Sequence, residues 1–292
     1  MATLNQWFEG SRPRTLPAAI APVAVGTGLA VNAGAASAPR AALALVVALA
    51  LQVGVNYSND YSDGIRGTDT DRVGPVRLVG QQLAAAGRVR MAAFAFFGLA
   101  CVAGLALVAV SGYWWLLLVG ACCVAAAWLY TGGPHPYGYA GLGEVFVLIF
   151  FGIVPVLGTC YVQSGTVSPA ALIASVSVGL LACAVLVTNN LRDIPTDEVS
   201  GKRTLAVRLG DARTRRLYAA CIAVSMVCTV AIAWLLGLII LAALLVFILA
   251  PVRVVMSNAR GRALVPALKQ TGLLVLLYGL ALGGLLVVLR PS

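Results

Sequence analysis

The chain has 292 residues, of which 61% are hydrophobic and only 10% are charged, and its mean hydropathy is +0.95. This composition excludes an ordinary soluble domain and indicates a protein of the lipid bilayer. A formal net charge of +10 would suggest nucleic-acid binding in a soluble protein, but the positions of the basic residues indicate membrane topology instead.

Apolar runs of about 20 residues recur along the chain, and each is long enough to cross the hydrocarbon core of a membrane. We predict nine transmembrane helices, over residues 16–33, 41–58, 92–111, 114–130, 142–162, 169–189, 217–235, 236–252 and 271–289. The break between the seventh and eighth runs is short, so eight spans is an alternative. Short outer connections favour an all-α bundle of antiparallel helices, which we expect to form one membrane domain over residues 1–292.

The basic residues are distributed unevenly between the two predicted faces. With nine spans and the N-terminus inside, all 20 Lys and Arg residues except Arg40 and Arg290 lie on the inner side. Since inner loops of membrane proteins are rich in Lys and Arg, this predicts a multi-pass protein of the cell (inner or cytoplasmic) membrane with a cytoplasmic N-terminus. Eight spans would place residues 253–269 outside and weaken this asymmetry. Most of these residues would set topology and contact membrane lipid, and no nucleic-acid partner is expected.

The second apolar run ends in an acidic cluster, residues 59–69 (NDYSDGIRGTD). Asn59 and Asp63 are four residues apart, so in a helix they share a face. Gly64 and Gly67 loosen the backbone after this turn, which would allow Asp69 to fold back toward the same point.

The sixth apolar run ends in a similar cluster, residues 189–197 (NNLRDIPTD). Asp193 and Asp197 repeat the four-residue spacing, but Pro195 between them favours a helix end over a regular helical turn. Both clusters fall on the inner face and precede Arg-rich sequence, which suggests two related four-helix halves and one extra span.

Placing a carboxylate at the edge of a bilayer costs free energy, so two acidic clusters on one face need an explanation. Two facing Asp-rich clusters can hold Mg²⁺, with Mn²⁺ as an alternative ion, and through the metal a diphosphate. One cluster alone could be a solvated helix end balanced by Arg. A cation transporter or channel is the competing class, but it would need ionisable residues near the bilayer midplane and access from both faces.

Together the clusters resemble the paired Asp-rich motifs of the UbiA superfamily of intramembrane prenyltransferases. Three further stretches resemble its 1,4-dihydroxy-2-naphthoate polyprenyltransferase branch: residues 12–17 (RPRTLP), 130–144 and 201–210 (GKRTLAVRLG). Many relatives carry an Asp four residues after the equivalent of Asp63, where this chain has Gly67. An Asp six residues on, as in Asp69, is typical of the naphthoate branch.

This resemblance implies an enzyme that moves a polyprenyl group from polyprenyl diphosphate to 1,4-dihydroxy-2-naphthoate, releasing diphosphate and CO₂ to give demethylmenaquinone. Other members of the superfamily use 4-hydroxybenzoate, homogentisate or a sugar phosphate, and these acceptors are the alternatives. The resemblance also implies the metal ligands, which would be Asn59, Asp60, Asp63, Asp69, Asp193 and Asp197.

Basic and amide side chains between the clusters are candidates for binding the diphosphate, because Arg forks match phosphate oxygens. These candidates are Arg66, Arg192, Lys202, Asn189 and Asn190, with Arg203 as a further one. Pairing with neighbouring Asp residues or lipid headgroups is the alternative for each basic residue. The sequence indicates no particular oligomeric state.

Catalytic and acceptor-binding roles are predicted for a third group of residues. The catalytic candidates are Asp63, Asp193, Tyr130 and Tyr137. The tyrosine rings could stabilise positive charge at the allylic carbon, although an interfacial aromatic belt is the alternative. The candidates for binding the aromatic acceptor are Arg12, Arg14, Tyr139 and Glu144. Glu144 begins a span, where an ionisable residue is a functional candidate by default.

Overall fold

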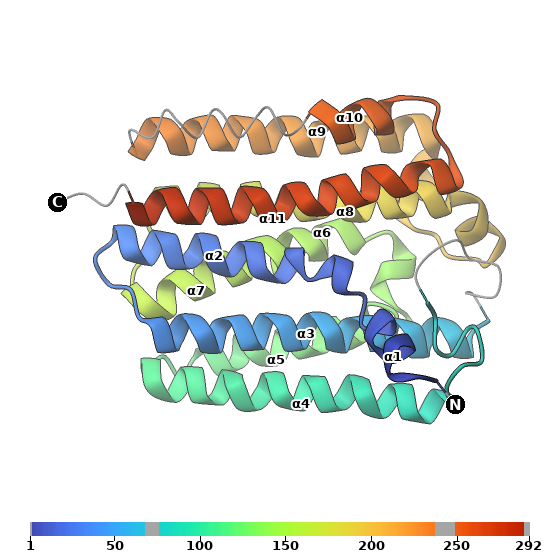
Figure 1. Cartoon of the computed structure of the whole chain (residues 1–292), viewed down its shortest axis with the longest axis horizontal. Coiled ribbons are helices and arrows are strands. Elements are labelled where there is room, and N and C mark those ends of the chain that lie inside the picture. The colour runs from blue at the N-terminus through green and yellow to red at the C-terminus, as the bar shows by residue number, and fades with distance from the viewer. Residues whose placement is uncertain (1, 68–75, 237–248, 289–292) are drawn as a thin grey trace.

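The computed structural model describes residues 2–67, 76–236 and 249–288, and within these ranges every regular element is a helix. Figure 1 shows long helices that run nearly parallel to one another, with the short helix α1 at one end of the bundle. The predicted all-α fold class is therefore confirmed.

Two short helices precede the first long one. α1 (Leu4–Gly10) is opened by a capping box between Thr3 and Gln6, and η1 (Pro13–Thr15) follows it. α2 (Pro17–Asn32) begins with proline, whose missing N–H would have no partner in the first turn. The α1–η1 segment and α2 meet at 49°, which places α1 beside the end of α3 (Figure 1).

The next three helices form one edge of the bundle in Figure 1. They are α3 (Ala38–Ile65), α4 (Ala86–Ser111) and α5 (Leu116–Leu129). Large apolar side chains on their outer faces are exposed, among them Val102 at 69% and Leu118 at 73%. Exposed apolar surface of this extent fits contact with lipid rather than water.

A continuous helical segment follows, with a change of winding in its middle. After η2 (Tyr137–Ala140), the segment consists of α6 (Gly143–Leu148), the π-helical turn η3 (Ile149–Ile153) and α7 (Val154–Ser164). The π turn brings Gly152 against α8, where a Cβ at Gly152 would lie 2.4 Å from the Cα of Gly179. Only glycine at these positions lets the two backbones approach so closely.

The C-terminal half contains the longest helices. They are α8 (Pro169–Val199) and α9 (Leu205–Leu236), followed by α10 (Leu249–Met256), η5 (Gly261–Leu264) and α11 (Val265–Val288). In Figure 1, α9 and α10 lie at the edge of the bundle opposite α4, and α8 and α11 lie between them and α2.

The structure departs from the helix end that Pro195 favours, because α8 continues through Pro195 to Val199. A proline removes one backbone donor, and here the loss falls in the last turns of a long, well-packed helix. Asp193 and Asp197 are therefore one helical turn apart, as Asn59 and Asp63 are in α3. The helical break comes later, at Gly210, whose φ of 74° and ψ of 171° interrupt α9.

Six helices in the described ranges are long and apolar enough to cross a membrane, or seven when the bent α1–α2 pair is counted as one span. The predicted fourth span, 114–130, corresponds to the shorter apolar helix α5. The predicted eighth span, 236–252, lies mostly outside the described residues. A multi-pass helical protein is confirmed, whereas the described helices do not reach the predicted nine.

The main core surrounds α8 and is shared with α2, α9 and α11. Its fully buried side chains include Leu181, Tyr218 and Leu282. The backbones of α2 and α11 nearly touch, since a Cβ at Gly28 would lie 2.5 Å from the carbonyl oxygen of Gly283. This tight packing fixes one side of the bundle, and the open space lies toward α3 and α5.

Candidate active site

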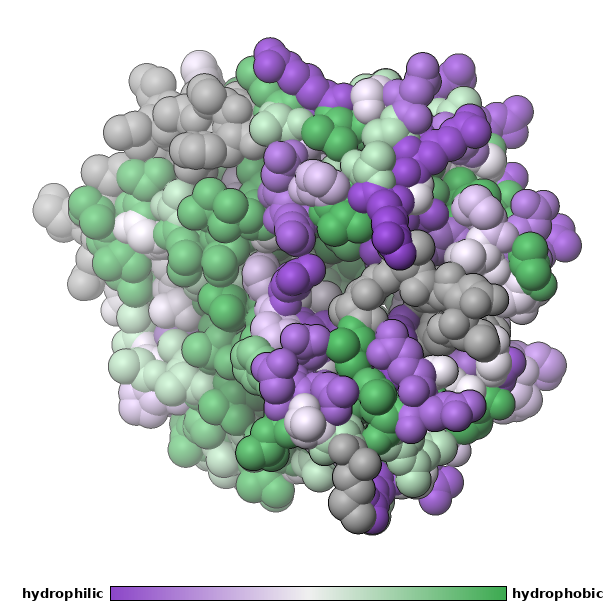
Figure 2. All heavy atoms as spheres, turned by 45° about the vertical axis from the view of Figure 1, so that its right-hand side comes forward, coloured by the Kyte–Doolittle hydropathy of each residue, from purple (hydrophilic) through white to green (hydrophobic). Residues whose placement is uncertain are grey.

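A cavity of about 1970 Å³ lies among helices α2 to α8 and reaches α11. Figure 2 shows polar side chains gathered around a hollow on the face toward the right-hand end of Figure 1. The polar end of the cavity is formed by Asn59, Asp63, Arg77, Tyr139, Asn189, Asn190, Arg192, Asp197 and Lys202. Its apolar part is lined by Leu105, Leu116, Val119, Phe146, Phe150 and Val154, among others. The cavity thus joins a charged site to a long apolar space.

One face of α3 supplies four polar side chains to this cavity: Gln52, Asn56, Asn59 and Asp63. All four are buried, and their spacing of four, three and four residues follows the helical period. Asn59 and Asp63 therefore share a face, as their spacing predicts. Gln52 and Asn56 were overlooked in the sequence, although polar side chains within the apolar run 41–58 are a signal that could have found them.

Three side chains from different segments contact the Asp63 carboxylate at the polar end. Its Oδ1 accepts a hydrogen bond from the Tyr139 hydroxyl at 2.5 Å and lies 3.1 Å from Lys202 Nζ. Its Oδ2 lies 3.8 Å from a guanidinium nitrogen of Arg77. A buried carboxylate needs such compensation. Segments that follow α3, α5 and α8 in sequence thus converge on one group.

α8 brings the second acidic cluster to the same cavity. The Arg192 guanidinium donates two hydrogen bonds to the Asp193 carboxylate, from Nε to Oδ1 at 2.6 Å and from Nη2 to Oδ2 at 2.7 Å. It also donates to Asn189 Oδ1 at 2.9 Å. Asp197 and Arg192 line the cavity, whereas the lining that the described residues define does not include Asp193. Asp193 therefore reaches the site through Arg192 in this structure.

Asp60, a predicted metal ligand of the first cluster, is absent from the cavity lining that the described residues define. Asp60 is fully buried, and its oxygens accept the backbone N–H groups of Leu78 and Val79 at 2.7 and 3.2 Å. This carboxylate braces the segment that carries Arg77. Asp69 lies outside the described residues. Their roles as metal ligands stay predictions.

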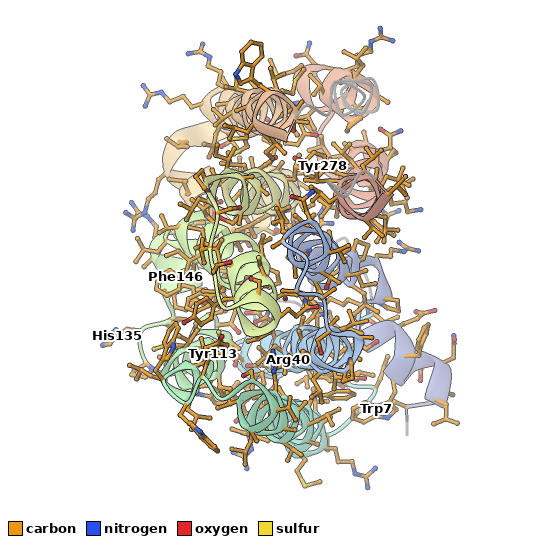
Figure 3. The ribbon with its side chains drawn as sticks, turned by 90° about the vertical axis from the view of Figure 1, so that its left-hand side faces the viewer. Trp7, Arg40, Tyr113, His135, Phe146 and Tyr278 are labelled. Carbon is orange, nitrogen blue, oxygen red and sulfur yellow. The ribbon has the colours of Figure 1, made fainter. Side chains whose placement is uncertain are left out.

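Three aromatic rings that contact one another line the cavity: Tyr130, Tyr137 and Phe146. Tyr137 stacks on Phe146 with ring centres 3.8 Å apart, and Tyr130 lies edge-on to Tyr137 at 5.5 Å. Figure 3 shows Phe146 on the same side of the bundle as Tyr113 and His135. The Tyr137 hydroxyl donates to the Ala126 carbonyl at 2.8 Å, and burial raises its pKa above the ordinary tyrosine value. Tyr137 therefore offers a neutral ring to the cavity.

The predicted acceptor-binding residues divide into two sets. Arg12 and Arg14 line the cavity beside α3, and Tyr139 lines it at the polar end. Glu144 lies behind Asn190, whose side-chain N–H donates to Glu144 Oε1 at 3.1 Å. The cavity lining described here includes Asn190 and omits Glu144, so Glu144 positions a lining residue.

Two of the basic residues predicted to bind the diphosphate, Arg66 and Arg203, form hydrogen bonds to backbone carbonyl groups. Arg66 donates to the carbonyl oxygens of Thr131 and of Gly133, the latter at 2.6 Å, and its guanidinium lies 5.4 Å from the ring centre of Tyr139. The backbone N–H of Arg203 donates to the Tyr139 carbonyl at 3.0 Å. Both residues hold the Tyr139 loop in place.

Other residues of the polar end were not singled out from the sequence. Arg77 is 5% exposed and faces Asp63, and the Thr131 hydroxyl donates to Asn59 Oδ1 at 2.8 Å. Arg262 and Lys269 from the η5–α11 region also line the cavity. Arg77 stands 14 residues after Asp63, in the loop that follows the acidic motif, and only the fold brings the two together.

The donor set at the polar end has the chemistry that Mg²⁺ requires. Asn59, Asp63 and Asp197 present amide and carboxylate oxygens to one cavity, and Mg²⁺ commonly takes one or two carboxylates with waters and phosphate oxygens. Within the described ranges, no group of three or more His, Cys, Asp or Glu side chains is close enough to hold an ion unaided. The residues therefore fit an ion that is shared with a phosphate ligand.

Comparison with known proteins points to one family. Residues 19–265 match the UbiA prenyltransferase family. The 1,4-dihydroxy-2-naphthoate octaprenyltransferase of Mycobacterium tuberculosis is 54% identical over 98% of both chains. The protein of the same name from Escherichia coli is 41% identical over 76% of this chain and 74% of its own length.

The fold also has a counterpart among solved structures. A UbiA homolog from Archaeoglobus fulgidus, solved bound to GPP and Mg²⁺, superposes with a TM-score of 0.71 over 97% of this chain and 99% of its own. The two sequences are 15% identical, so this likeness concerns the fold.

Proposed function

This chain belongs to the UbiA prenyltransferase family, and we propose that it transfers a polyprenyl group from polyprenyl diphosphate to 1,4-dihydroxy-2-naphthoate. The products would be diphosphate, CO₂ and the prenylated hydroquinone, which is the reduced form of demethylmenaquinone. The names of the relatives from M. tuberculosis and E. coli support this acceptor.

The observation that carries the proposal is the single cavity that joins both Asp motifs to a long apolar space. A polyprenyl diphosphate has the same two-part character. Its anionic head would lie at the polar end among Lys202, Arg77 and Arg192, since charge-assisted hydrogen bonds to phosphate are strong. Its apolar tail would extend along α4 and α5, away from water.

Asn59, Asp63 and Asp197 would hold the metal, together with Asp69 of the predicted ligand set. Asp60 and Asp193 would act indirectly, through the backbone of Leu78 and Val79 and through Arg192. The metal, Mg²⁺ or alternatively Mn²⁺, would neutralise charge on the departing diphosphate. Mg²⁺ bound to the A. fulgidus homolog of the same fold supports this choice. Lys202 and Arg77, now paired with Asp63, are placed to turn toward a bound diphosphate.

The reaction begins when the bond between the allylic carbon and the diphosphate oxygen breaks, with its electron pair leaving on oxygen. The faces of Tyr130 and Tyr137 would stabilise the positive charge that develops on carbon. The electron-rich naphthoate ring then supplies the pair that forms the new carbon–carbon bond. The carboxylate then leaves as CO₂ and its bonding electron pair stays in the ring, which restores aromaticity; overall the carboxylate form of the acceptor releases CO₂ and no net proton. Arg12 and Arg14 would hold the carboxylate of the acceptor before it is lost.

We also propose the predicted topology of nine spans, with the N-terminus and the polar end on the cytoplasmic side of the cell membrane. The basic residues of the polar end and its surrounding loops support this orientation. Anionic lipid headgroups would contact the same face.

The proposal is tested with purified protein in nanodiscs, a polyprenyl diphosphate, 1,4-dihydroxy-2-naphthoate and Mg²⁺. We expect mass spectrometry to detect a prenylated, decarboxylated product that disappears when EDTA is added. If 4-hydroxybenzoate, homogentisate or a sugar phosphate is prenylated and dihydroxynaphthoate is not, the acceptor proposed here is wrong.

A further inference from the structure

We propose that Gln52 determines acceptor specificity by taking a hydrogen bond from a phenolic hydroxyl of the aromatic substrate; this inference rests on the function proposed above. Gln52 is only 5% exposed and lines the cavity from the middle of α3. Its Oε1 is buried and finds no hydrogen-bond partner among the described residues. Burying a hydrogen-bond acceptor without a partner inside an apolar span costs free energy. The site is therefore suited to a ligand that supplies a hydrogen-bond donor.

The orientation of the Gln52 amide follows from its neighbours. The Thr15 hydroxyl donates its hydrogen to the Arg12 carbonyl at 2.9 Å, so its oxygen can only accept from other groups. It accepts from Gln52 Nε2 at 2.9 Å and from Asn56 Nδ2 at 2.9 Å. The nitrogen of Gln52 is therefore held toward Thr15, and its buried oxygen, on the other side of the amide group, makes no hydrogen bond to the described residues.

Asn56 reinforces this arrangement. Its side-chain N–H groups donate to Thr15 and also to the Ser11 carbonyl at 2.8 Å. These bonds tie the segment between α1 and α2 to α3, which Figure 1 shows lying side by side at the polar end of the bundle. Gln52 is thus fixed before any ligand binds, which limits the entropy lost on recognition.

The depth of Gln52 separates it from the diphosphate. It precedes Asn59 by seven residues, which is about 10 Å along a helix with a rise of 1.5 Å per residue. Polar residues of the metal and phosphate end lie at Asn59 and beyond. Gln52 therefore lies further along α3 from the diphosphate end, at the depth in the cavity where the allylic carbon and the acceptor ring would lie.

The Gln52 carbonyl oxygen can distinguish between the two substrates, because it accepts hydrogen bonds and cannot donate them. The prenyl chain has no donor, and a diphosphate presents mainly acceptor oxygens. The ring hydroxyls of dihydroxynaphthoate are donors. The hydroxyl beside the carboxylate can bond to it internally, so the hydroxyl across the ring, at position 4, is the one free to reach Gln52.

This contact would orient the ring and favour the correct acceptor. By accepting a hydrogen bond from the 4-hydroxyl group, Gln52 would increase the electron density of the ring. The proton would stay on the substrate oxygen. A site built to bind a hydroxyl rejects an analogue without it, because the buried partner is then left unpaired. Gln52 would discriminate against naphthoates that lack the 4-hydroxyl.

The test compares two ligands on the same protein under anaerobic conditions. One is 1,4-dihydroxy-2-naphthoate, measured by its KM, and the other is 1-hydroxy-2-naphthoate, measured by its inhibition constant. We expect the wild-type protein to prefer the dihydroxy compound by about tenfold, the size of one hydrogen bond. In Gln52→Met this preference should fall below about twofold, with the KM for prenyl diphosphate unchanged.

Gln163→Met is the matched control. Gln163 is equally buried, at 5%, and is hydrogen-bonded to Thr159 and Thr27, but it is not among the described residues that line the cavity. Its substitution should leave the preference intact. Thr15→Val is a second test, because it keeps Gln52 and removes the hydroxyl that orients it. It should lower the preference even if Gln52→Met fails to fold.

The outcomes separate the two proposals. A preference retained by Gln52→Met, or a wild-type protein that binds both naphthoates equally, would overturn the role of Gln52 alone. A wild-type protein that prenylates no dihydroxynaphthoate would overturn the proposed function, and the role of Gln52 with it.

Discussion

Lys202 and Asp63 form a buried ion pair, with Nζ 3.1 Å from Oδ1 and both side chains at most 6% exposed. The pair links the end of α3, which carries the first acidic motif, to the loop that follows α8 and the second acidic motif. Because a buried ion pair is a weak source of stability, we interpret it as a cation held ready for the diphosphate.

Lys202→Met is therefore expected to raise the KM for polyprenyl diphosphate by about tenfold or more, since it removes a charge-assisted contact. The KM for the acceptor should change much less. Lys202→Arg, which keeps the charge, should recover part of the affinity. Equal increases in both KM values would show that Lys202 supports the cavity as a whole and does not bind the diphosphate.

Substitution of the acidic motifs should stop the reaction in a folded protein. We expect Asp63→Ala and Asp193→Ala each to abolish turnover, the first by removing a metal oxygen and the second by releasing Arg192 from its bidentate contact. Activity is compared with thermal unfolding of the same preparations. Near-normal turnover in either variant would rule out the role assigned to that residue.

Asp60 is expected to act on stability. Loss of its two backbone acceptors in Asp60→Ala should destabilise the protein by about 1–3 kcal/mol, because the N–H groups of Leu78 and Val79 are left unpaired. The thermal unfolding midpoint should fall, while the Mg²⁺ concentration for half-maximal activity should stay the same. A large increase in that Mg²⁺ concentration would instead support Asp60 as a metal ligand.

The ring of Tyr137 should matter more than its hydroxyl. Tyr137→Phe keeps the stacking on Phe146 and loses only the bond to the Ala126 carbonyl, so kcat should remain within about threefold of wild type. Tyr137→Leu removes the aromatic face and should lower kcat about tenfold or more. Comparable losses in both variants would point to the hydroxyl as the active group.

Periodicity and charge were sufficient to predict much of the fold. The apolar runs located the long helices because a bilayer imposes their length. The four-residue spacing placed Asn59 and Asp63 on one face of α3 because a helix repeats every 3.6 residues. The prediction failed at Pro195, where packing along α8 outweighs the lost backbone bond.

Less of the site than of the fold could be predicted from the sequence, because contacts between residues far apart in the chain form the site. Arg77 faces Asp63 from a loop whose next two residues, Leu78 and Val79, donate their backbone N–H groups to Asp60. Glu144 accepts a hydrogen bond from Asn190 on α8, and its role in binding the acceptor stays a prediction. Neither pairing has a local sequence signal. Gln52 did have one, since a glutamine within an apolar span is itself unusual.

The central claim is that both Asp motifs act on one diphosphate in one cavity. The most direct test is binding of a non-hydrolysable prenyl thiodiphosphate to wild type, Asp63→Asn and Asp197→Asn, each with Mg²⁺ and with EDTA. We predict binding that requires Mg²⁺ in the wild type and is lost in both variants. Mg²⁺-dependent binding that persists unchanged in either variant would show that its motif does not hold the diphosphate, and would contradict the account.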